Sequence, residues 1–408
     1  MSEIRYVLNA DRRRPGEGAD LSFVSREEAE RARAYHRTFP EYRPTPLVPL
    51  PNLARDLGVS RVFVKDESHR FGLNAFKVLG ASYAIGRYLA WRLGEDISEI
   101  TPGRLAAPEV RERLGEITFV AATDGNHGRA VAWAAQQLGQ KAVIYMPKGS
   151  DPIRLANIRA HGADASITDL NYDDAVRLAD RMAREHGWVV VQDTAWPGYE
   201  DIPTWIMQGY ATLAVEALEQ LREHGAEGPT HLFLQAGVGS FAGGVAGFIA
   251  SALGERMPAI VIVEPDRADC FYRSAEAGDG RPHAVTGDLN TLMAGLACGE
   301  PNPIGWEILR DYACAYFSCP DWVAANGMRI LAAPLQGDPR VVSGESGAVT
   351  CGLLERILGS PGLADARDAL GLDEGSTVLL VSTEGDTSPR TYREVVWYGR
   401  CPGALDRP

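Results

Sequence analysis

The stretch that decides the fold reads KDESHRFGLNAFKVLGAS, from Lys65 to Ser82. At its centre Lys77 lies between the apolar residues Phe76 and Val78, where an amphipathic helix is predicted to begin. Burial disfavours the charged form of a lysine, so its pKa falls, and the neutral amine condenses with aldehydes. A surface lysine whose stem packs while its head reaches water has the same pattern. Lys77 alone leaves both interpretations open.

Apolar runs of strand length alternate with amphipathic helical patterns over most of the chain, which predicts an α/β fold with parallel sheets. The polar segment 94–115, punctuated by Pro and Gly, is expected to be an exposed insertion. Predicted strands are residues 62–65, 117–122, 141–146, 165–169, 188–192, 231–235, 259–264 and 378–382. Predicted helices are residues 78–93, 129–138, 153–161, 173–186, 204–224, 245–253, 306–312, 321–332 and 347–358.

The length and one loop indicate how the domains divide. A chain of 408 residues suits two or three domains of about 100–200 residues each. The loop at 194–203 reads TAWPGYEDIP and is rich in turn residues, so a boundary is placed there.

A second informative stretch is the glycine-rich turn QAGVGSFAGG, residues 235–244, between a predicted strand and a predicted helix. Its N–H groups and the positive end of the helix predict a phosphate site. The spacing departs from G-x-G-x-x-G, because Gly237 and Gly239 fit but the next glycine is Gly243. Glu264 ends the following strand and could bind a ribose, as in a dinucleotide fold. A tight turn without a ligand is the remaining interpretation.

A third stretch, TDGNHG at residues 123–128, follows another predicted strand. The carboxyl end of a parallel strand is where open α/β sheets bind ligands. Asp124 is either a catalytic carboxylate or a cap of the next helix. His127 has no visible metal-ligand partner in the sequence, so we expect a hydrogen-bonded structural histidine.

Composition excludes several classes of function. A net charge of −13 argues against a nucleic-acid surface, which needs clustered Lys and Arg. Neither a signal-peptide core nor a run of eighteen apolar residues occurs, so we expect no membrane segment and a cytoplasmic protein. The six cysteines lack zinc-type spacing, so no metal is expected. A disulfide between Cys270 and Cys298 stays open.

Together, the three stretches resemble those of the fold type II pyridoxal-phosphate enzymes, which have the tryptophan synthase β-like architecture. A strand-end motif, STEGDT at residues 382–387, completes the order seen in that family. The wording KDESHRFGLNAFK, TDGNHG, VQDTAW, TLMAGLACGEP and STEGDT is most similar to the diaminopropionate ammonia-lyases within it. This resemblance spans nearly the whole chain. It implies two parallel-sheet α/β domains with the cofactor between them, and a homodimer. The large domain, residues 1–77 and 200–408, would bind pyridoxal 5'-phosphate, and residues 78–199 would form the smaller α/β domain.

The resemblance also implies a role for each matching residue. Lys77 would form the internal aldimine, and Asn126 would contact the 3′-oxygen of the pyridoxal ring. Thr383 would face the pyridine nitrogen, where a neutral hydroxyl favours β-elimination over transamination. The residues expected to hold the phosphate are Gly237, Val238, Gly239, Ser240 and Gly243.

Asp124 departs from the hydroxyamino-acid dehydratases, which carry a serine in the corresponding S-S-G-N-H loop. A carboxylate repels a carboxylate, so Asp124 is expected to meet an ammonium or act as a base, and Asp193 in VQDTAW has the same preference. The implied reaction is α,β-elimination of 2,3-diaminopropionate, in both D and L forms, to pyruvate and ammonia. Lys77 and Asp124 are expected to flank opposite faces of the substrate Cα.

Three other functions stay open. The nearest is a pyridoxal-phosphate-dependent serine or threonine dehydratase. A nicotinamide-dependent oxidoreductase accounts for the glycine turn and Glu264, but it gives Lys77 no role. An inactive protein that binds pyridoxal phosphate or an amino acid keeps the site without releasing pyruvate. The expected partner is a small-molecule amino-acid substrate.

Overall fold

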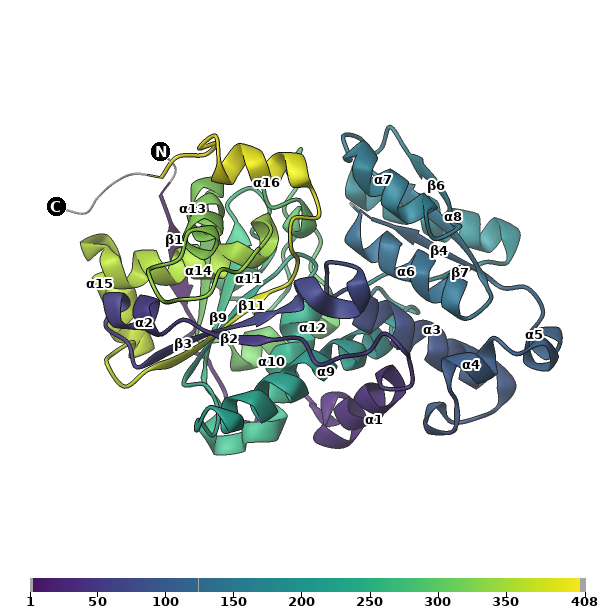
Figure 1. The fold of residues 1–408 in the computed structure, drawn as a ribbon, viewed down its shortest axis with the longest axis horizontal. Coiled ribbons are helices and arrows are strands. Elements are labelled where there is room, and N and C mark those ends of the chain that lie inside the picture. The colour runs from purple at the N-terminus through teal and green to yellow at the C-terminus, as the bar shows by residue number, and fades with distance from the viewer. Residues whose placement is uncertain (1–2, 124, 404–408) are drawn as a thin grey trace.

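The structure is a computed structural model that describes residues 3–123 and 125–403. Its strands form a seven-stranded and a four-stranded sheet, and the smaller sheet lies with its helices at one end of the molecule (Figure 1). The predicted α/β class with parallel sheets is confirmed. The strands are β1 (Arg5–Leu8), β2 (Leu47–Pro49), β3 (Arg61–Asp66), β4 (Thr118–Ala122), β5 (Lys141–Met146), β6 (Asp164–Ile167), β7 (Val189–Val190), β8 (His231–Gln235), β9 (Ala259–Pro265), β10 (Ala315–Cys319) and β11 (Thr377–Ser382).

Sixteen α-helices connect these strands within the described residues. They are α1 (Arg26–His36), α2 (Pro51–Leu57), α3 (Val78–Leu93), α4 (Pro102–Leu105), α5 (Pro108–Leu114), α6 (Asn126–Gln137), α7 (Pro152–Arg159), α8 (Tyr172–His186), α9 (Asp201–Glu223), α10 (Ser240–Leu253), α11 (Cys270–Ala277), α12 (Pro303–Tyr312), α13 (Asp321–Ala332), α14 (Glu345–Gly359), α15 (Ala364–Leu370) and α16 (Pro389–Val396). None of the described helices is long and apolar enough to cross a bilayer.

The seven-stranded sheet has the order β1-β10-β9-β8-β11-β3-β2. Its five inner strands are parallel, and β1 and β2 close the two edges in antiparallel pairs. Successive side chains of a strand point to opposite faces, so Leu232 and Leu234 pack with α9 and α10 while Phe233 packs with α13 and α14. Both faces are covered, which is why β8 is buried throughout.

The four-stranded sheet has the order β6-β5-β4-β7 and is entirely parallel. On one face Val120 and Ala122 pack against the alanines of α8. On the other face Phe119 and Ala121 pack in the main core with α6. Both sheets therefore direct the carboxyl ends of their parallel strands to loops that carry the sequence motifs. The residue limits of the two domains stay a prediction.

Most predicted elements occur where the sequence pattern placed them, and α3, β5, β8 and α13 have the predicted bounds. More than half of the residues in the segment 94–115 are exposed, as predicted, but the segment is anchored in the core. It folds into short helices, and its apolar side chains pack in the main core: Ile97, Ile100, Leu105, Val110 and Leu114. Because polar residues and helix breakers separate these apolar residues, the sequence pattern did not indicate that they are buried.

Candidate active site

A cavity of about 650 Å³ lies at the carboxyl ends of strands from both sheets. Lys77 follows β3 by eleven positions, Thr123 follows β4, and Asp193 comes just after β7. Gln235 ends β8 and Thr383 follows β11 directly. This is the position at which open parallel sheets bind ligands, because the loops there converge on one edge.

Lys77 caps the N-terminal end of α3 against an aromatic wall. The ring centroids of Tyr210 and Phe241 each lie 4.7 Å from that of Phe76, and the Lys77 Nζ lies 5.5 Å from the Phe76 ring centroid. The side chain of Lys77 is 18% exposed. The lysine is thus enclosed by apolar groups and opens onto the cavity, rather than reaching out to bulk water.

The Lys77 ammonium donates a short hydrogen bond to the carboxylate of Asp193, which is buried. Burial raises the pKa of Asp193, but the charges of Lys77 and His127 outweigh it and lower that pKa to about 2. Asp193 is therefore ionised at neutral pH and serves as the counter-ion of Lys77. Sequence analysis expected an acid at Asp193 that meets an ammonium; the ammonium it meets here is the protein's own.

The glycine turn leads from β8 into α10 beside the cavity. Gly239 has a φ of +93°, a conformation that favours glycine, and an added Cβ there would lie 2.1 Å from Cζ of Phe271. An added Cβ on Gly237 would lie 3.2 Å from Gly295 O and from the Cα of Leu296. Because α10 is fourteen residues long, its N-terminus supplies a positive end to this cradle. The turn fits a phosphate group.

Ser240 and Gly243, which were both expected to bind the phosphate, form hydrogen bonds within the protein instead. The Ser240 hydroxyl donates to the Asp193 carbonyl and accepts a 2.7 Å hydrogen bond from Asn302 Nδ2. Gly243 does not line the cavity, and its N–H donates to Gly239 O at 2.7 Å. An added Cβ on Gly243 would lie 2.8 Å from the Cα of Gly305, so the structure gives Gly243 a packing role between α10 and α12. Val238, like Gly237 and Gly239, lines the cavity.

The hydroxyl of Thr383 is oriented by Gln235, whose Nε2 donates to Thr383 Oγ1 at 2.8 Å and to Val381 O at 3.0 Å. A hydroxyl that accepts in this way keeps its own proton for another acceptor. Thr383 lines the cavity, so it suits the predicted contact with a neutral pyridine nitrogen.

Asn126 begins α6 and donates from Nδ2 to Glu384 Oε2 at 2.5 Å, and Thr387 donates to the same oxygen at 2.8 Å. Glu384 Oε1, Gln235 Oε1 and Ser346 Oγ are buried and have no hydrogen-bond partner among the described residues. All three residues line the cavity. An orphaned buried polar group costs about 1–3 kcal/mol, so these atoms fit a cavity that receives a polar ligand.

Sequence reasoning missed Glu384, Ser346 and Arg154. Arg154 on α7 donates to Glu345 Oε1, at the start of α14, at 3.0 Å and to Thr387 Oγ1, in the loop before α16, at 3.3 Å. Only Glu384 had a sequence signal, since it follows Thr383 in the STEGDT motif. Arg154 and Ser346 lie in helices without a motif, and only the fold brings them to the cavity.

Of the TDGNHG residues, Asp124 lies outside the described residues. His127 shares a 2.7 Å hydrogen bond between Nε2 and Val191 O, which confirms a hydrogen-bonded structural histidine. Glu264 does not line the cavity. Its carboxylate accepts from the N–H groups of Phe271 and Tyr272 at 2.8 and 2.7 Å, at the start of α11. Glu264 is therefore a helix cap and not a ribose-binding acid.

The six cysteines are free thiols, and no disulfide joins Cys270 to Cys298. Both are buried next to Gly237: Cys270 Sγ lies 3.9 Å from Gly237 O, and an added Cβ on Gly237 would lie 3.4 Å from Cys298 Sγ. Burial raises the pKa of Cys270 well above its ordinary value, so its thiol stays protonated. Within residues 3–123 and 125–403, no group of three or more His, Cys, Asp or Glu side chains is placed to hold a metal ion.

The fold and this cavity define a pyridoxal-phosphate-dependent enzyme of fold type II. The chain belongs to the family described as pyridoxal-phosphate dependent enzyme, which it matches over residues 38–384. The nicotinamide alternative is thereby excluded, in agreement with the capping role of Glu264.

Relatives within this family narrow the comparison. The chain is 56% identical to a diaminopropionate ammonia-lyase of Salmonella typhimurium, over 97% of this chain and 98% of the relative. It superposes on the crystal structure of the Escherichia coli diaminopropionate ammonia lyase in complex with D-serine with a TM-score of 0.91, at 51% identity, covering 98% and 99% of the two chains. A second structure of that lyase, in complex with an aminoacrylate-PLP azomethine reaction intermediate, gives a TM-score of 0.89 at 51% identity, with 98% of each chain covered.

Proposed function

We propose that the chain catalyses α,β-elimination of 2,3-diaminopropionate, releasing pyruvate and two molecules of ammonia. The observation that carries this proposal is the 56% identity to a diaminopropionate ammonia-lyase over nearly the whole of both chains. The Lys77–Asp193 ion pair, which lines the same cavity as the glycine turn, supports the proposal. The products balance, because both nitrogens of the substrate leave and one water supplies the keto oxygen of pyruvate.

The cavity residues divide the binding of pyridoxal phosphate among them. Gly237 to Gly239 would hold the phosphate with backbone N–H groups, and Thr383 would donate its hydroxyl proton to the ring nitrogen. Asn126 would contact the 3′-oxygen. When bound, pyridoxal phosphate supplies a carbonyl carbon that links to an amine and a ring that takes up the electrons left at Cα.

Lys77 performs the first proton steps in this proposal. With pyridoxal phosphate bound, Lys77 would be the amine that holds its carbonyl carbon, and the Lys77 Nζ would act as a base toward the proton on the substrate Cα. While Lys77 is protonated, the Asp193 carboxylate accepts a hydrogen bond from its ammonium and balances its charge. Carboxylates at 124 and 193 attract a diamine and repel a second carboxylate, so they favour diaminopropionate over aspartate-like substrates.

The two enantiomers require bases on opposite faces of Cα, and we assign these to Lys77 and Asp124. Asp124→Asn keeps size and hydrogen bonding but removes the basicity. It should slow elimination of D-diaminopropionate by about 10²–10⁴-fold and leave the L-form far less affected. Equal loss on both enantiomers would make Asp124 an ammonium contact or a helix cap and would refute the two-base assignment.

The experiment that tests the whole proposal is pyruvate release from D- and L-diaminopropionate beside D- and L-serine and L-threonine. Turnover of diaminopropionate well above that of the hydroxyamino acids supports the proposal. The reverse order of substrates makes the chain a dehydratase, and no pyruvate from any of them makes it a binding protein. We also propose a homodimer in the cytoplasm, which light scattering and cell fractionation test directly.

A further inference from the structure

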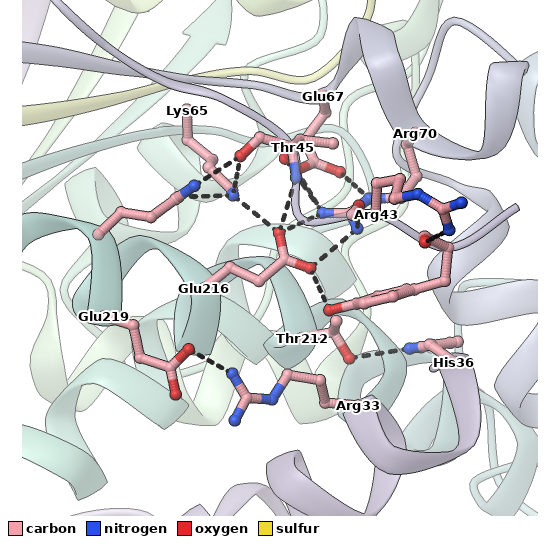
Figure 2. Close-up of polar contacts among 12 residues, drawn as sticks. Arg33, His36, Arg43, Thr45, Lys65, Glu67, Arg70, Thr212, Glu216 and Glu219 are labelled. Carbon is pink, nitrogen blue, oxygen red and sulfur yellow. Dashed lines mark hydrogen bonds and ion pairs between the residues drawn. The ribbon is translucent and has the colours of Figure 1, made fainter. Parts of the chain in front are cut away.

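A network of buried charges lies beneath the segment that carries Lys77. It joins two cations, Lys65 and Arg70, to two carboxylates, Glu67 and Glu216, and each of these side chains is at most 1% exposed (Figure 2). The formal charges cancel. Buried ions are costly unless they are paired and fully hydrogen-bonded, so the completeness of the pairing matters more than its strength.

Arg70 is the residue at which the network converges. One edge of its guanidinium donates to Glu67 from Nε and Nη2, at 2.8 Å each. The other edge donates to Glu216 from Nη1 at 2.9 Å and from Nη2 at 2.7 Å. Two bidentate pairs fix the guanidinium plane, and with it the position of the chain at residue 70.

The remaining donors and acceptors are supplied by α9 and by the N-terminal segment. Lys65 Nζ donates to Glu216 at 2.7 Å, to Thr45 O at 2.7 Å and to Gln220 Oε1 at 2.9 Å, which uses all three of its protons. Tyr42 donates to Glu216 Oε1 at 2.8 Å. The network therefore connects β3, the turn after it, residues 42–45 and α9 into one unit.

This unit fixes one end of the segment that leads to Lys77. At Arg70 the chain enters a tight turn closed by a 2.9 Å hydrogen bond from Leu73 N to Arg70 O, with positive φ at Phe71 (+49°) and Asn74 (+59°). The other end is held by β11, because Phe76 N donates to Thr383 O at 3.0 Å. Lys77 is the next residue.

The helix that follows Lys77 is held from the same side. His36 on α1 shares a 2.9 Å hydrogen bond between Nε2 and the Leu79 carbonyl, two residues beyond Lys77. Its Nδ1 lies 2.9 Å from Thr212 Oγ1, one turn before Glu216 on α9. Because a carbonyl only accepts, Nε2 carries the proton, and Nδ1 accepts from Thr212. Helix α9 therefore supports the chain on both sides of Lys77, through Glu216 and Arg70 before it and through Thr212 and His36 after it.

We propose that the Lys65–Glu67–Arg70–Glu216 network is a positioning device for Lys77, which sets the place of Nζ relative to the cofactor carbonyl carbon. The inference rests on the proposed role of Lys77. The residues themselves do not touch the substrate or the cofactor, and they act through the backbone of residues 70–77. A shift of about 1 Å in a reacting group costs on the order of 100-fold in rate, so small distortions of this turn are measurable.

The test is Arg70→Lys, which keeps the positive charge and removes the bidentate geometry, compared with Arg33→Lys. Arg33 on α1 pairs with Glu219 on α9 at 2.6 Å, and in the described part of the chain its hydrogen bonds and ion pairs involve Glu30 and Glu219 but no residue of 65–77 (Figure 2). Three quantities are measured: deuterium uptake of peptides within 67–80 in the cofactor-free protein, the fraction of cofactor that borohydride fixes to Lys77, and kcat with KM.

For Arg70→Lys we expect faster deuterium uptake confined to 67–80, a several-fold lower fixed fraction at saturating pyridoxal phosphate, and kcat reduced by roughly 10–100-fold with KM little changed. Arg33→Lys should leave all three at wild-type values. A lower melting temperature in Arg70→Lys with an unchanged fixed fraction and kcat would make the network purely structural and overturn the proposal.

Should Arg70→Lys fail to fold, Tyr42→Phe decides, because it removes one hydrogen bond to Glu216 and no charge. A smaller change in the same three quantities supports the proposal, and wild-type values overturn it. Borohydride labelling of the wild-type protein separates this result from the proposed function: if the wild type is not labelled at Lys77, the function assigned to that lysine has failed, and the positioning proposal fails with it.

Discussion

Two lysines of the same motif, twelve positions apart, each pair with a carboxylate, and the structure uses them in opposite ways. Lys65 is fully buried, and its three protons go to Glu216, a carbonyl and an amide. Lys77 is 18% exposed, opens onto the cavity and bonds to Asp193. Both carboxylates have a pKa lowered to about 2 against the raising effect of burial.

The difference teaches that the ion pair alone does not identify a reactive lysine. Each lysine has a carboxylate partner within ion-pair distance. What distinguishes Lys77 is access to a cavity with orphaned polar atoms and a glycine cradle. The three protons of the Lys65 ammonium, in contrast, are all donated to acceptors in the protein interior. Burial lowers the pKa of Lys65, but no substrate can reach it.

The largest expected effect separates the two lysines by their chemistry. Lys77→Ala should reduce pyruvate release by on the order of 10⁴-fold or more, as loss of a covalent catalyst does. Borohydride reduction followed by peptide mapping should label Lys77 in the wild type and no lysine in the variant. Lys141→Ala, at an exposed ion pair with Glu116, is the control and should keep full activity. A label on Lys148, which also lines the cavity, would transfer the role to that residue.

The next prediction compares the two carboxylates. Asp193→Asn should lower kcat by about 10²-fold or more, because the Lys77 ammonium loses its counter-ion. Glu216→Gln should instead lower the free energy of unfolding by about 3–5 kcal/mol, since it leaves Lys65 and Arg70 with one uncompensated buried charge. Urea unfolding and steady-state kinetics on both variants measure the contrast. If Asp193→Asn destabilises the protein as much as Glu216→Gln while retaining kcat, the division between reactive and structural pairs is wrong.

A smaller effect concerns the glycine cradle, which lines the same cavity as Lys77. Gly237→Ala places a methyl group 3.2 Å from backbone atoms at no cost in φ, and it should weaken pyridoxal phosphate binding by about 10-fold. Gly103→Ala, in open space on α4, is the matched control. Gly239 is unsuitable for this test, because its positive φ and the contact with Phe271 would disturb the fold as well. Identical titration curves for wild type and Gly237→Ala would place the phosphate elsewhere.

The smallest expected effect is the pH dependence of the free energy of unfolding that comes from two buried groups, His36 and Glu216. Burial lowers the pKa of His36 from 6.5 to about 3, so between these values the unfolded chain binds a proton that the folded chain does not, and stability falls as the pH falls. Glu216 adds to this below its ordinary value of 4.5, and its contribution is lost toward pH 2. From pH 7 to 5 the contribution of His36 is a loss of about 1–2 kcal/mol, measured by urea unfolding as the difference in pH slope between the wild type and His36→Gln. An equal slope in the variant would show that His36 is not the group responsible.

Much of this architecture could be read from local patterns. The alternation of strand and helix periods predicted β5, β8, α3 and α13 with their observed bounds, because each pattern depends only on which face of an element is buried. The glycines at 237 and 239 predicted a cradle, because glycine spacing near a helix start has a direct backbone meaning. The resemblance of the motifs supplied the family and the roles that stay predictions, including that of Asp124.

Side-chain partnerships were decided by the tertiary structure alone. Lys77 meets Asp193 across 116 positions, and Arg70 meets Glu216 across 146, because strand order in the sheets determines which loops and helices become neighbours. The sequence shows two similar lysines in one motif. The packing of α9 against that motif makes Lys65 a fixed structural charge, and the cavity beside Lys77 leaves that lysine accessible. Burial and access are properties of the whole fold, so the sequence alone does not show this difference.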